Sequence, residues 1–281
     1  LVHHVSQQLP IFTLSEILGI PEGDRQKLVS WMEFLELAQY FTYEMIKEQN
    51  EGKTDSTPDP AMIEMFNAMV DEMFDYGRFI LKEKRKNPSD DLLSAIANAE
   101  IEGEKLTDEF LDGSWLLIIF AGNDTTRNTM SGGIKLLHEN PKQKELLMQD
   151  TGLLTNFIHE TIRCVSPVIH MRRTSLEETE IGGQRIGPFE KISLWYGAAN
   201  RDPDIFENPN EFNILRENAD KHLAFGIGRH TCLGKPIALM QLKEFYSQFL
   251  SRFKDFELNG EWKVAPNNFV HAIQEMPIKF T

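Results

Sequence analysis

The chain has 281 residues, of which 41% are hydrophobic, and this is enough for a globular fold with a buried core. Its formal net charge of -14 argues against nucleic acid as a partner and against anionic lipid, because both require clustered Lys and Arg. We see no signal peptide, no membrane span of roughly 18 apolar residues and only two cysteines, so we expect a cytoplasmic protein in a reducing compartment.

Helical periodicity dominates the first two thirds of the chain. Apolar residues at helical spacing, with capping residues at several starts, predict helices at residues 12–18, 24–43, 61–83, 92–100 and 107–138. The segment 47–60 is polar and rich in helix breakers, so we expect a loop there.

The last third is mixed. Pro167 ends another helix, and residues 180–193 alternate between turn glycines, which predicts a small β region. A long helix over 237–253 and a strand-like tail follow. We therefore expect a mainly α fold with a small β region, organised as a single domain over residues 1–281.

The first motif lies inside the helix predicted at 107–138. Phe120-Ala121-Gly122-Asn123-Asp124-Thr125-Thr126 places Gly and Thr in a helix interior, where both weaken helical hydrogen bonding, so we expect a local distortion. Asp124 and Thr125 are an adjacent acid and alcohol that could relay protons. The alternative is that Asn123-Asp124-Thr125 only caps a new helix.

Two further patterns are weak in isolation. Glu160 and Arg163, at positions i and i+3, share one helix face and could be an ordinary surface ion pair. Arg172-Arg173-Thr174 follows Pro167, and the two arginines could be solvated.

The strongest motif is Phe225-Gly226-Ile227-Gly228-Arg229-His230-Thr231-Cys232-Leu233-Gly234. A thiolate ligand to a metal in a flat macrocycle needs a backbone that passes close to the ring, which glycines allow, and a positive environment, which a following helix supplies. The alternative is an inert cysteine in a glycine-rich turn. The order Phe-Gly-x-Gly-x-His-x-Cys-x-Gly makes a chance match remote.

This motif resembles the haem-binding signature of the cytochrome P450 superfamily, and the upstream motifs resemble the family's others in the expected order. The resemblance implies that the chain binds haem b (iron protoporphyrin IX) and that the sulfur of Cys232 binds the haem iron. It also implies that the haem is contacted by His230, Phe225, Gly226, Gly234, Ala121 and Gly122. It implies that Arg173 pairs with a haem propionate. Asp124 and Thr125 would activate oxygen, and Glu160 and Arg163 would be the family's structural pair.

The same resemblance implies a pocket for a hydrophobic substrate, lined by Ile118, Ala121, Gly122, Val168, Ile169, Met171, Phe269 and Val270. It leans to branches that hydroxylate terminal carbons of alkanes, fatty acids or other lipids. The third member of the family's structural cluster is expected near residues 208–212. Because Glu211 stands there, the role is vacant or passes to a neighbour such as Arg216.

The resemblance covers almost the whole chain and begins at Leu9-Pro10, so we expect roughly the first quarter of a usual bacterial member to be missing. We therefore expect these 281 residues alone to bind haem poorly, which stable stoichiometric binding of hemin would contradict.

The expected function is that of a monooxygenase. A group of basic residues near Cys232 in sequence, the basic island, comprises Arg216, Lys221, Arg229, Lys235 and Lys243. It predicts docking of an acidic ferredoxin, which an NAD(P)H-dependent ferredoxin reductase would reduce. Two alternatives stay open, a peroxide-driven peroxygenase and a non-catalytic haem-binding remnant.

Overall fold

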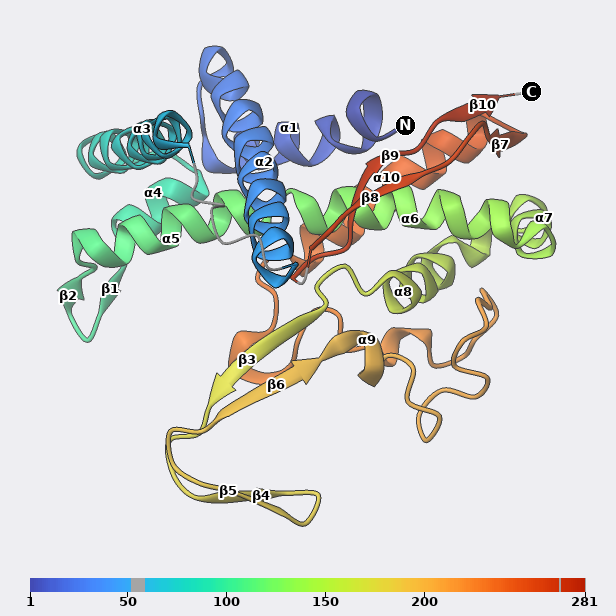
Figure 1. The fold of residues 1–281 in the computed structure, drawn as a ribbon. Coiled ribbons are helices and arrows are strands. Elements are labelled where there is room, and N and C mark those ends of the chain that lie inside the picture. Colours follow the sequence, from blue (N-terminus) through green and yellow to red (C-terminus); the bar gives the residue numbers. More distant parts are fainter. Residues whose placement is uncertain (52–58, 268, 281) are drawn as a thin grey trace. The chain divides into compact units, whose positions relative to one another are not determined.

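The computed structural model describes residues 1–51, 59–267 and 269–280, and for residues 36–44 and 49 it describes the backbone only. Within these ranges the chain forms helices and five small antiparallel two-stranded sheets (Figure 1). It divides into two compact units, residues 7–124 and residues 1–6 with 125–281, and each is described by itself. The predicted mainly α fold with a small β region is confirmed, and the single domain stays a prediction.

Residues 7–124 form a helical unit with one hairpin. Its elements are α1 (Gln8–Leu18), α2 (Arg25–Asn50), α3 (Pro60–Lys86), α4 (Leu92–Ala97), β1 (Glu100–Ile101), β2 (Glu104–Lys105) and α5 (Asp108–Ala121). Because α2 continues to Asn50, the loop predicted over 47–60 is wrong at its start, and residues 52–58 of it lie outside the described residues. Asp91 caps α4 as expected, with the Ser94 N–H donating to its Oδ1 at 2.7 Å.

An aromatic cluster holds this unit together. The ring of Trp31 lies 5.4 Å from that of Tyr76 and 6.3 Å from that of Trp115, centroid to centroid. All three side chains are at most 9% exposed, and Trp115 Nε1 donates to the Met73 carbonyl at 2.9 Å. The indole therefore fixes α5 against α3, and with it the end of α5 that carries part of the first motif.

The helical hydrogen bonding is interrupted at Gly122 and Asn123, between α5 and α6 (Asp124–Glu139). A Cβ at residue 122 would lie 3.0 Å from the Leu14 side chain and 3.1 Å from the Ile118 carbonyl, so only glycine fits without a shift. The predicted distortion is confirmed, and a new helix does begin at Asp124.

The other unit contains α6 from Thr125 onward and all later elements. Its helices are α7 (Pro141–Gln149), α8 (Leu154–Val165), α9 (Tyr196–Ala199) and α10 (Lys235–Arg252). Its antiparallel strand pairs are β3 (His170–Thr174) with β6 (Lys191–Trp195), β4 (Thr179–Ile181) with β5 (Gln184–Ile186), β7 (Phe256–Leu258) with β10 (Ile278–Phe280), and β8 (Lys263–Ala265) with β9 (Ala272–Glu275). Figure 1 shows the β4–β5 hairpin continuing from the β3–β6 pair.

The core of this unit forms where α8 packs against α10. The rings of Phe157 and Tyr246 meet edge to face at 4.7 Å, and the Tyr246 hydroxyl donates to the Thr129 carbonyl of α6 at 2.8 Å. The contact between Phe157 and Tyr246 therefore buries one face of α8 against α10. No helix among the described residues is long and apolar enough to cross a membrane.

Candidate functional site

The cysteine loop, defined here as residues 222–234, holds Cys232 in an exposed position before α10. Gly226 (φ 68°) and Gly228 (φ 72°) adopt left-handed conformations that glycine tolerates. A Cβ at residue 226 would also lie 3.2 Å from the His230 carbonyl oxygen. The Cys232 N–H donates to the Phe225 carbonyl at 2.8 Å, so the loop closes on itself and turns the thiol outward.

The surroundings of the thiol suit a flat apolar ligand. Ile227 is 76% exposed and Leu233 is 79% exposed, although both are apolar, and His230 beside them is exposed as well. A macrocycle whose metal accepts a thiolate would cover these side chains, and its carboxylates could be reached by His230. Gly234 lies close to the sulfur, since a Cβ there would be 3.9 Å from Sγ. The donor set therefore fits haem.

Behind the loop lies a buried charge cluster made of Glu160, Arg163 and Arg216. Glu160 and Arg163 are completely buried, and the guanidinium donates from Nε and Nη2 to the two carboxylate oxygens, each at 2.8 Å. The surface ion pair considered from the sequence is therefore wrong. Arg216 Nε donates to both oxygens of the same carboxylate at 3.1 Å, so Arg216 takes the third role.

Backbone carbonyls complete the charge cluster. Arg163 Nη1 donates to the Asn200 and Pro209 carbonyls at 2.8 Å, and both arginines donate to the carbonyl of Glu211. Burial opposes the charged form of Arg163, but its hydrogen bonds to Glu160 raise the pKa of the guanidinium. With two cations, one anion and several carbonyl partners, the cluster fixes α8 to the segment that leads into the cysteine loop.

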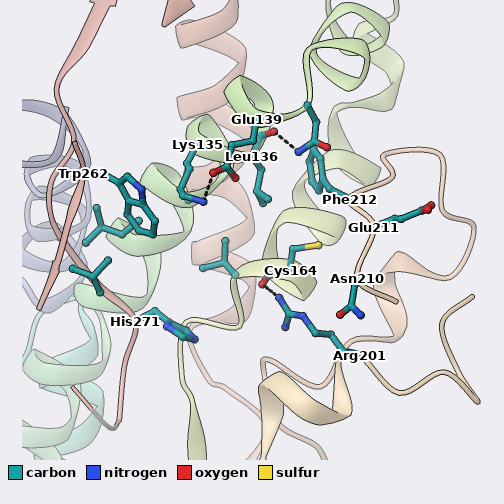
Figure 2. A pocket seen from close by; sticks show the side chains of 15 residues that line it. Lys135, Leu136, Glu139, Cys164, Arg201, Asn210, Glu211, Phe212, Trp262 and His271 are labelled. Atoms are coloured by element: carbon teal, nitrogen blue, oxygen red, sulfur yellow. Dashed lines mark hydrogen bonds and ion pairs between the residues drawn. The ribbon is translucent and has the colours of Figure 1, made fainter. Parts of the chain in front are cut away.

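The second cysteine has different surroundings. Cys164 lines a cavity of ≈ 680 Å³, where Arg201 donates to the Cys164 carbonyl at 2.6 Å and Lys135 pairs with Glu139 at 2.6 Å (Figure 2). Burial, with Glu160 adding to it, raises the pKa of the Cys164 thiol to about 11. This thiol therefore stays protonated near neutral pH, and none of the sequence-predicted site residues lines the cavity.

The acid and the alcohol of the first motif begin α6. Asp124 is 3% exposed and its Oδ1 accepts from the Asn123 side-chain amide at 3.2 Å, while Thr125 is half-buried. Asp124 is the last residue of one unit, whereas Thr125 belongs to the unit that contains Cys232. The Thr125 carbonyl accepts from the Thr129 hydroxyl at 2.7 Å, which holds the first turn of the helix.

Several of the predicted pocket residues come together beside β3. Val168 forms a β-bridge with Val270, and the Ile169 N–H donates to the Phe269 carbonyl at 2.8 Å. Val270 itself is only 3% exposed. These contacts join residues about 100 positions apart in the sequence.

β3 also carries Met171 and Arg173, both half-buried and two residues apart, so they share one face of the strand. Arg173 Nη1 donates to the Arg172 carbonyl at 2.9 Å. The other predicted pocket residues belong to residues 7–124. There Ile118 packs against the core of its own unit and Ala121 is exposed.

One predicted surface requires a correction. Arg216, counted in the basic island, is 7% exposed and bound to Glu160, so it is not available to a partner. Lys221, Arg229 and Lys243 are exposed, and Lys235 is half-buried with its Nζ 5.5 Å from the Phe225 ring centroid.

Sequence reasoning missed two groups beside the loop. The side chain of Asn200 accepts a hydrogen bond from the Leu223 N–H at 2.6 Å. His159 Nδ1 lies 3.3 Å from His222 Nε2, and burial is the main cause that lowers the pKa of His222 to about 4. Neither contact follows from a local pattern, since the partners are 23 and 63 residues apart.

Comparison with known proteins identifies the family. The family model described as cytochrome P450 matches residues 54–280. The chain is 33% identical to Linalool 8-monooxygenase of Pseudomonas putida over 99% of its length and 64% of that protein, and 32% identical to Steroid C26-monooxygenase of Mycobacterium tuberculosis over 100% and 72%. It thus spans less than two thirds of the length of the linalool enzyme.

A solved structure agrees with these relatives. The cytochrome P450 CYP268A2 of Mycobacterium marinum, in complex with pseudoionone, matches with a TM-score of 0.85 at 34% identity, over 99% of this chain and 64% of that one. The match extends across both compact units and includes the cysteine loop and the charge cluster. The chain belongs to the cytochrome P450 family.

Proposed function

We propose that the protein is a haem-thiolate monooxygenase, which inserts one oxygen atom from O₂ into a C–H bond of a hydrophobic substrate. Members of its family bind haem b. The observation that carries the proposal is the exposed, free Cys232 in a glycine loop before a helix, backed by the buried charge cluster. The other cysteine is unsuited to be the ligand, because its thiol pKa is raised.

The residues of this chain divide the work of holding the cofactor. Cys232 would bind the haem iron through its sulfur, while His230 and Arg173 would bind the propionates as hydrogen-bond donors. Phe225, Gly226 and Gly234 of the cysteine loop would also contact the cofactor. Bound through a thiolate, haem b activates dioxygen and transfers one of its oxygen atoms to a substrate.

Proton supply is assigned to the start of α6. The Thr125 hydroxyl would donate a proton for oxygen activation, and the carboxyl of Asp124, its neighbour in sequence, would replace that proton. The break at Gly122 and Asn123 supports this assignment, since it interrupts the helix immediately before the two side chains. A peroxygenase would not need such a pair.

The substrate is expected to be apolar. Val168, Ile169, Met171, Phe269 and Val270, which are all apolar, gather beside β3. The relatives named for linalool and for a steroid act on hydrophobic molecules. For this protein we propose substrates from the alkanes, fatty acids and other lipids.

Electrons would come from a ferredoxin and its NAD(P)H-dependent reductase. The exposed cation Arg229 lies within the cysteine loop, and the exposed cations Lys221 and Lys243 lie before and after it in sequence. The net charge of the whole chain is -14. An acidic ferredoxin would be attracted to this patch and repelled by the rest of the surface.

The function is tested with the complete gene product that carries this sequence, supplied with reduced ferredoxin, isotopically labelled O₂ and a panel of fatty acids and terpenoids. Incorporation of one labelled oxygen atom into the product supports the proposal. Product formed with hydrogen peroxide but not with ferredoxin would show a peroxygenase, and no product from either oxidant would show a non-catalytic haem protein.

Variants of α6 test the proton path. Thr125→Val and Asp124→Asn are each expected to lower product formation by about 100-fold, with electrons diverted to peroxide. Thr126→Val removes the neighbouring hydroxyl and should leave product formation within about twofold of wild type. An equal loss of product formation in Thr125→Val and Thr126→Val would contradict the role proposed for the Thr125 hydroxyl.

A further inference from the structure

A single buried amide joins the charge cluster to the cysteine loop. Asn200 is fully buried, and its side-chain Oδ1 accepts from the Leu223 N–H at 2.6 Å. Its Nδ2 donates to the Ser166 hydroxyl at 2.9 Å, and that hydroxyl donates to the Arg163 carbonyl at 2.8 Å. Both functional groups of the amide are therefore used, one toward the loop and one toward the end of α8.

The backbone of Asn200 is fixed by the same charge cluster. Arg163 Nη1 donates to the Asn200 carbonyl at 2.8 Å, and the Asn200 N–H donates to the Tyr196 carbonyl at 2.8 Å. Because the arginine is itself held by Glu160, residue 200 has little freedom to move relative to α8. Its side-chain oxygen is thus a fixed point from which the loop can be positioned.

On the loop side, a short path of hydrogen bonds leads to the thiol. The Leu223 carbonyl accepts from the Gly226 N–H at 2.8 Å, which forms the turn around Phe225. The Phe225 carbonyl then accepts from the Cys232 N–H at 2.8 Å. From Asn200 to Cys232 the path therefore runs through Leu223, Gly226 and Phe225.

We propose that Asn200 is the positioning residue of the cysteine loop, which sets where Cys232 presents its sulfur. Among the described residues outside 222–234, no other side chain makes a hydrogen bond to the loop backbone. The loop is exposed around the cysteine and is closed by hydrogen bonds within the loop itself, including that from the Thr231 hydroxyl to the Gly228 carbonyl. Loss of the Asn200 contact would leave the His159–His222 pair as the remaining side-chain contact at the upstream end of the loop.

The first test does not depend on haem. In the 281-residue chain, amide hydrogen exchange is measured by NMR for wild type and for Asn200→Ala. We expect the amides of Leu223, Gly226 and Cys232 to exchange about tenfold faster or more, while amides in the middle of α10 keep their rates, since one buried hydrogen bond is lost locally. Unchanged loop amides, or an equal increase throughout the chain, would overturn the proposal.

Two conservative variants separate the two ends of the amide. Asn200→Asp keeps an acceptor for Leu223 and loses the donor to Ser166, and its negative charge is compatible with a neighbouring cluster of two cations and one anion. Ser166→Ala removes the other partner. Both should keep the slow exchange of Leu223, and faster exchange in Asn200→Asp, matching that of Asn200→Ala, would contradict the assigned acceptor. These variants keep the test decisive even where Asn200→Ala does not fold.

The second readout rests on the proposed function. In the haem-loaded gene product, Asn200→Ala should increase the fraction whose ferrous–CO band lacks the red shift of thiolate ligation, and Asn200→Asp should restore the red-shifted band. Unchanged bands would contradict positioning of the sulfur. If wild type holds no haem while the exchange result stands, the proposed function fails and the role of Asn200 in the loop is retained.

Discussion

The buried charge cluster and the cysteine loop differ in almost every physical respect. In the cluster, Glu160 and Arg163 have no exposed surface and each is held by several short hydrogen bonds. In the loop, Cys232 is exposed, and so are Ile227 and Leu233 on either side of it. In the charge cluster the polar groups bind one another, whereas in the cysteine loop the thiol is left accessible to a ligand.

The difference shows how a fold can offer a reactive group without making that group carry the stability. Charges in the interior are costly unless they are paired and bonded, so the cluster tolerates almost no change. The loop contributes little apolar burial and can be optimised for its ligand. Mutations in the two regions should therefore separate folding from cofactor binding.

The largest expected effect comes from the interior. Glu160→Gln leaves two guanidiniums buried without a carboxylate and should lower the free energy of unfolding by about 3–5 kcal/mol. Denaturant unfolding measures it. The control is Glu139→Gln, whose ion pair with Lys135 is partly exposed and should matter by about 0.5 kcal/mol or less. Similar losses in both variants would contradict the contrast between interior and surface charges.

A second effect lies where the two regions meet, at His222. Burial lowers the pKa of His222 to about 4 in the folded chain. Between pH ~6.5 and pH ~4 this histidine is therefore protonated in the unfolded chain but neutral in the folded chain. Stability should fall as the pH falls through this window, by about 3 kcal/mol in total, and level off below it.

Urea unfolding across that pH range, for wild type and His222→Gln, tests this expectation. The variant should lack the His222 part of the pH dependence, whereas His4→Gln, which removes an exposed histidine, should follow wild type. A pH dependence that is the same in all three proteins would show that His222 titrates alike in both states.

The smallest effect concerns two glycines of the loop. Gly226→Ala forces a side chain into a left-handed conformation and should cost about 1–2 kcal/mol. Gly234 has φ -79°, so Gly234→Ala should cost less than about 1 kcal/mol and act mainly on haem affinity. Thermal unfolding without haem measures the loss of stability in each variant, and a hemin titration measures the loss of haem affinity. Equal losses of thermal stability in the two variants would contradict the expectation that Gly234→Ala acts mainly on haem affinity.

Much of the fold was predictable because its signals are local. The helix starts at Asp91 and Thr107 are set by side chains that cap the next turn, and both caps are present. The glycine spacing around Cys232 predicted a turn, and two of its glycines have positive φ. The extension of α2 to Asn50 was missed because its last four residues, 47–50, are polar and carry no core-facing pattern.

The contacts that organise the site were less predictable, because they join distant segments. Arg216 was considered as a replacement for Glu211, but its simultaneous place in the basic island was wrong, since only tertiary packing decides which arginine is buried. No local pattern predicted that Asn200 contacts the cysteine loop. An asparagine in a polar segment predicts a turn, and its partners Ser166 and Leu223 lie 34 and 23 residues away.

The central claim is the proposal that Cys232, and not Cys164, would bind the haem iron through its sulfur. The most direct measurement is the ferrous–CO spectrum of the haem-loaded gene product with either cysteine replaced by serine. Cys164→Ser should keep the red-shifted thiolate band, and Cys232→Ser should lose it. A thiolate band that survives in Cys232→Ser, or disappears in Cys164→Ser, would contradict the account.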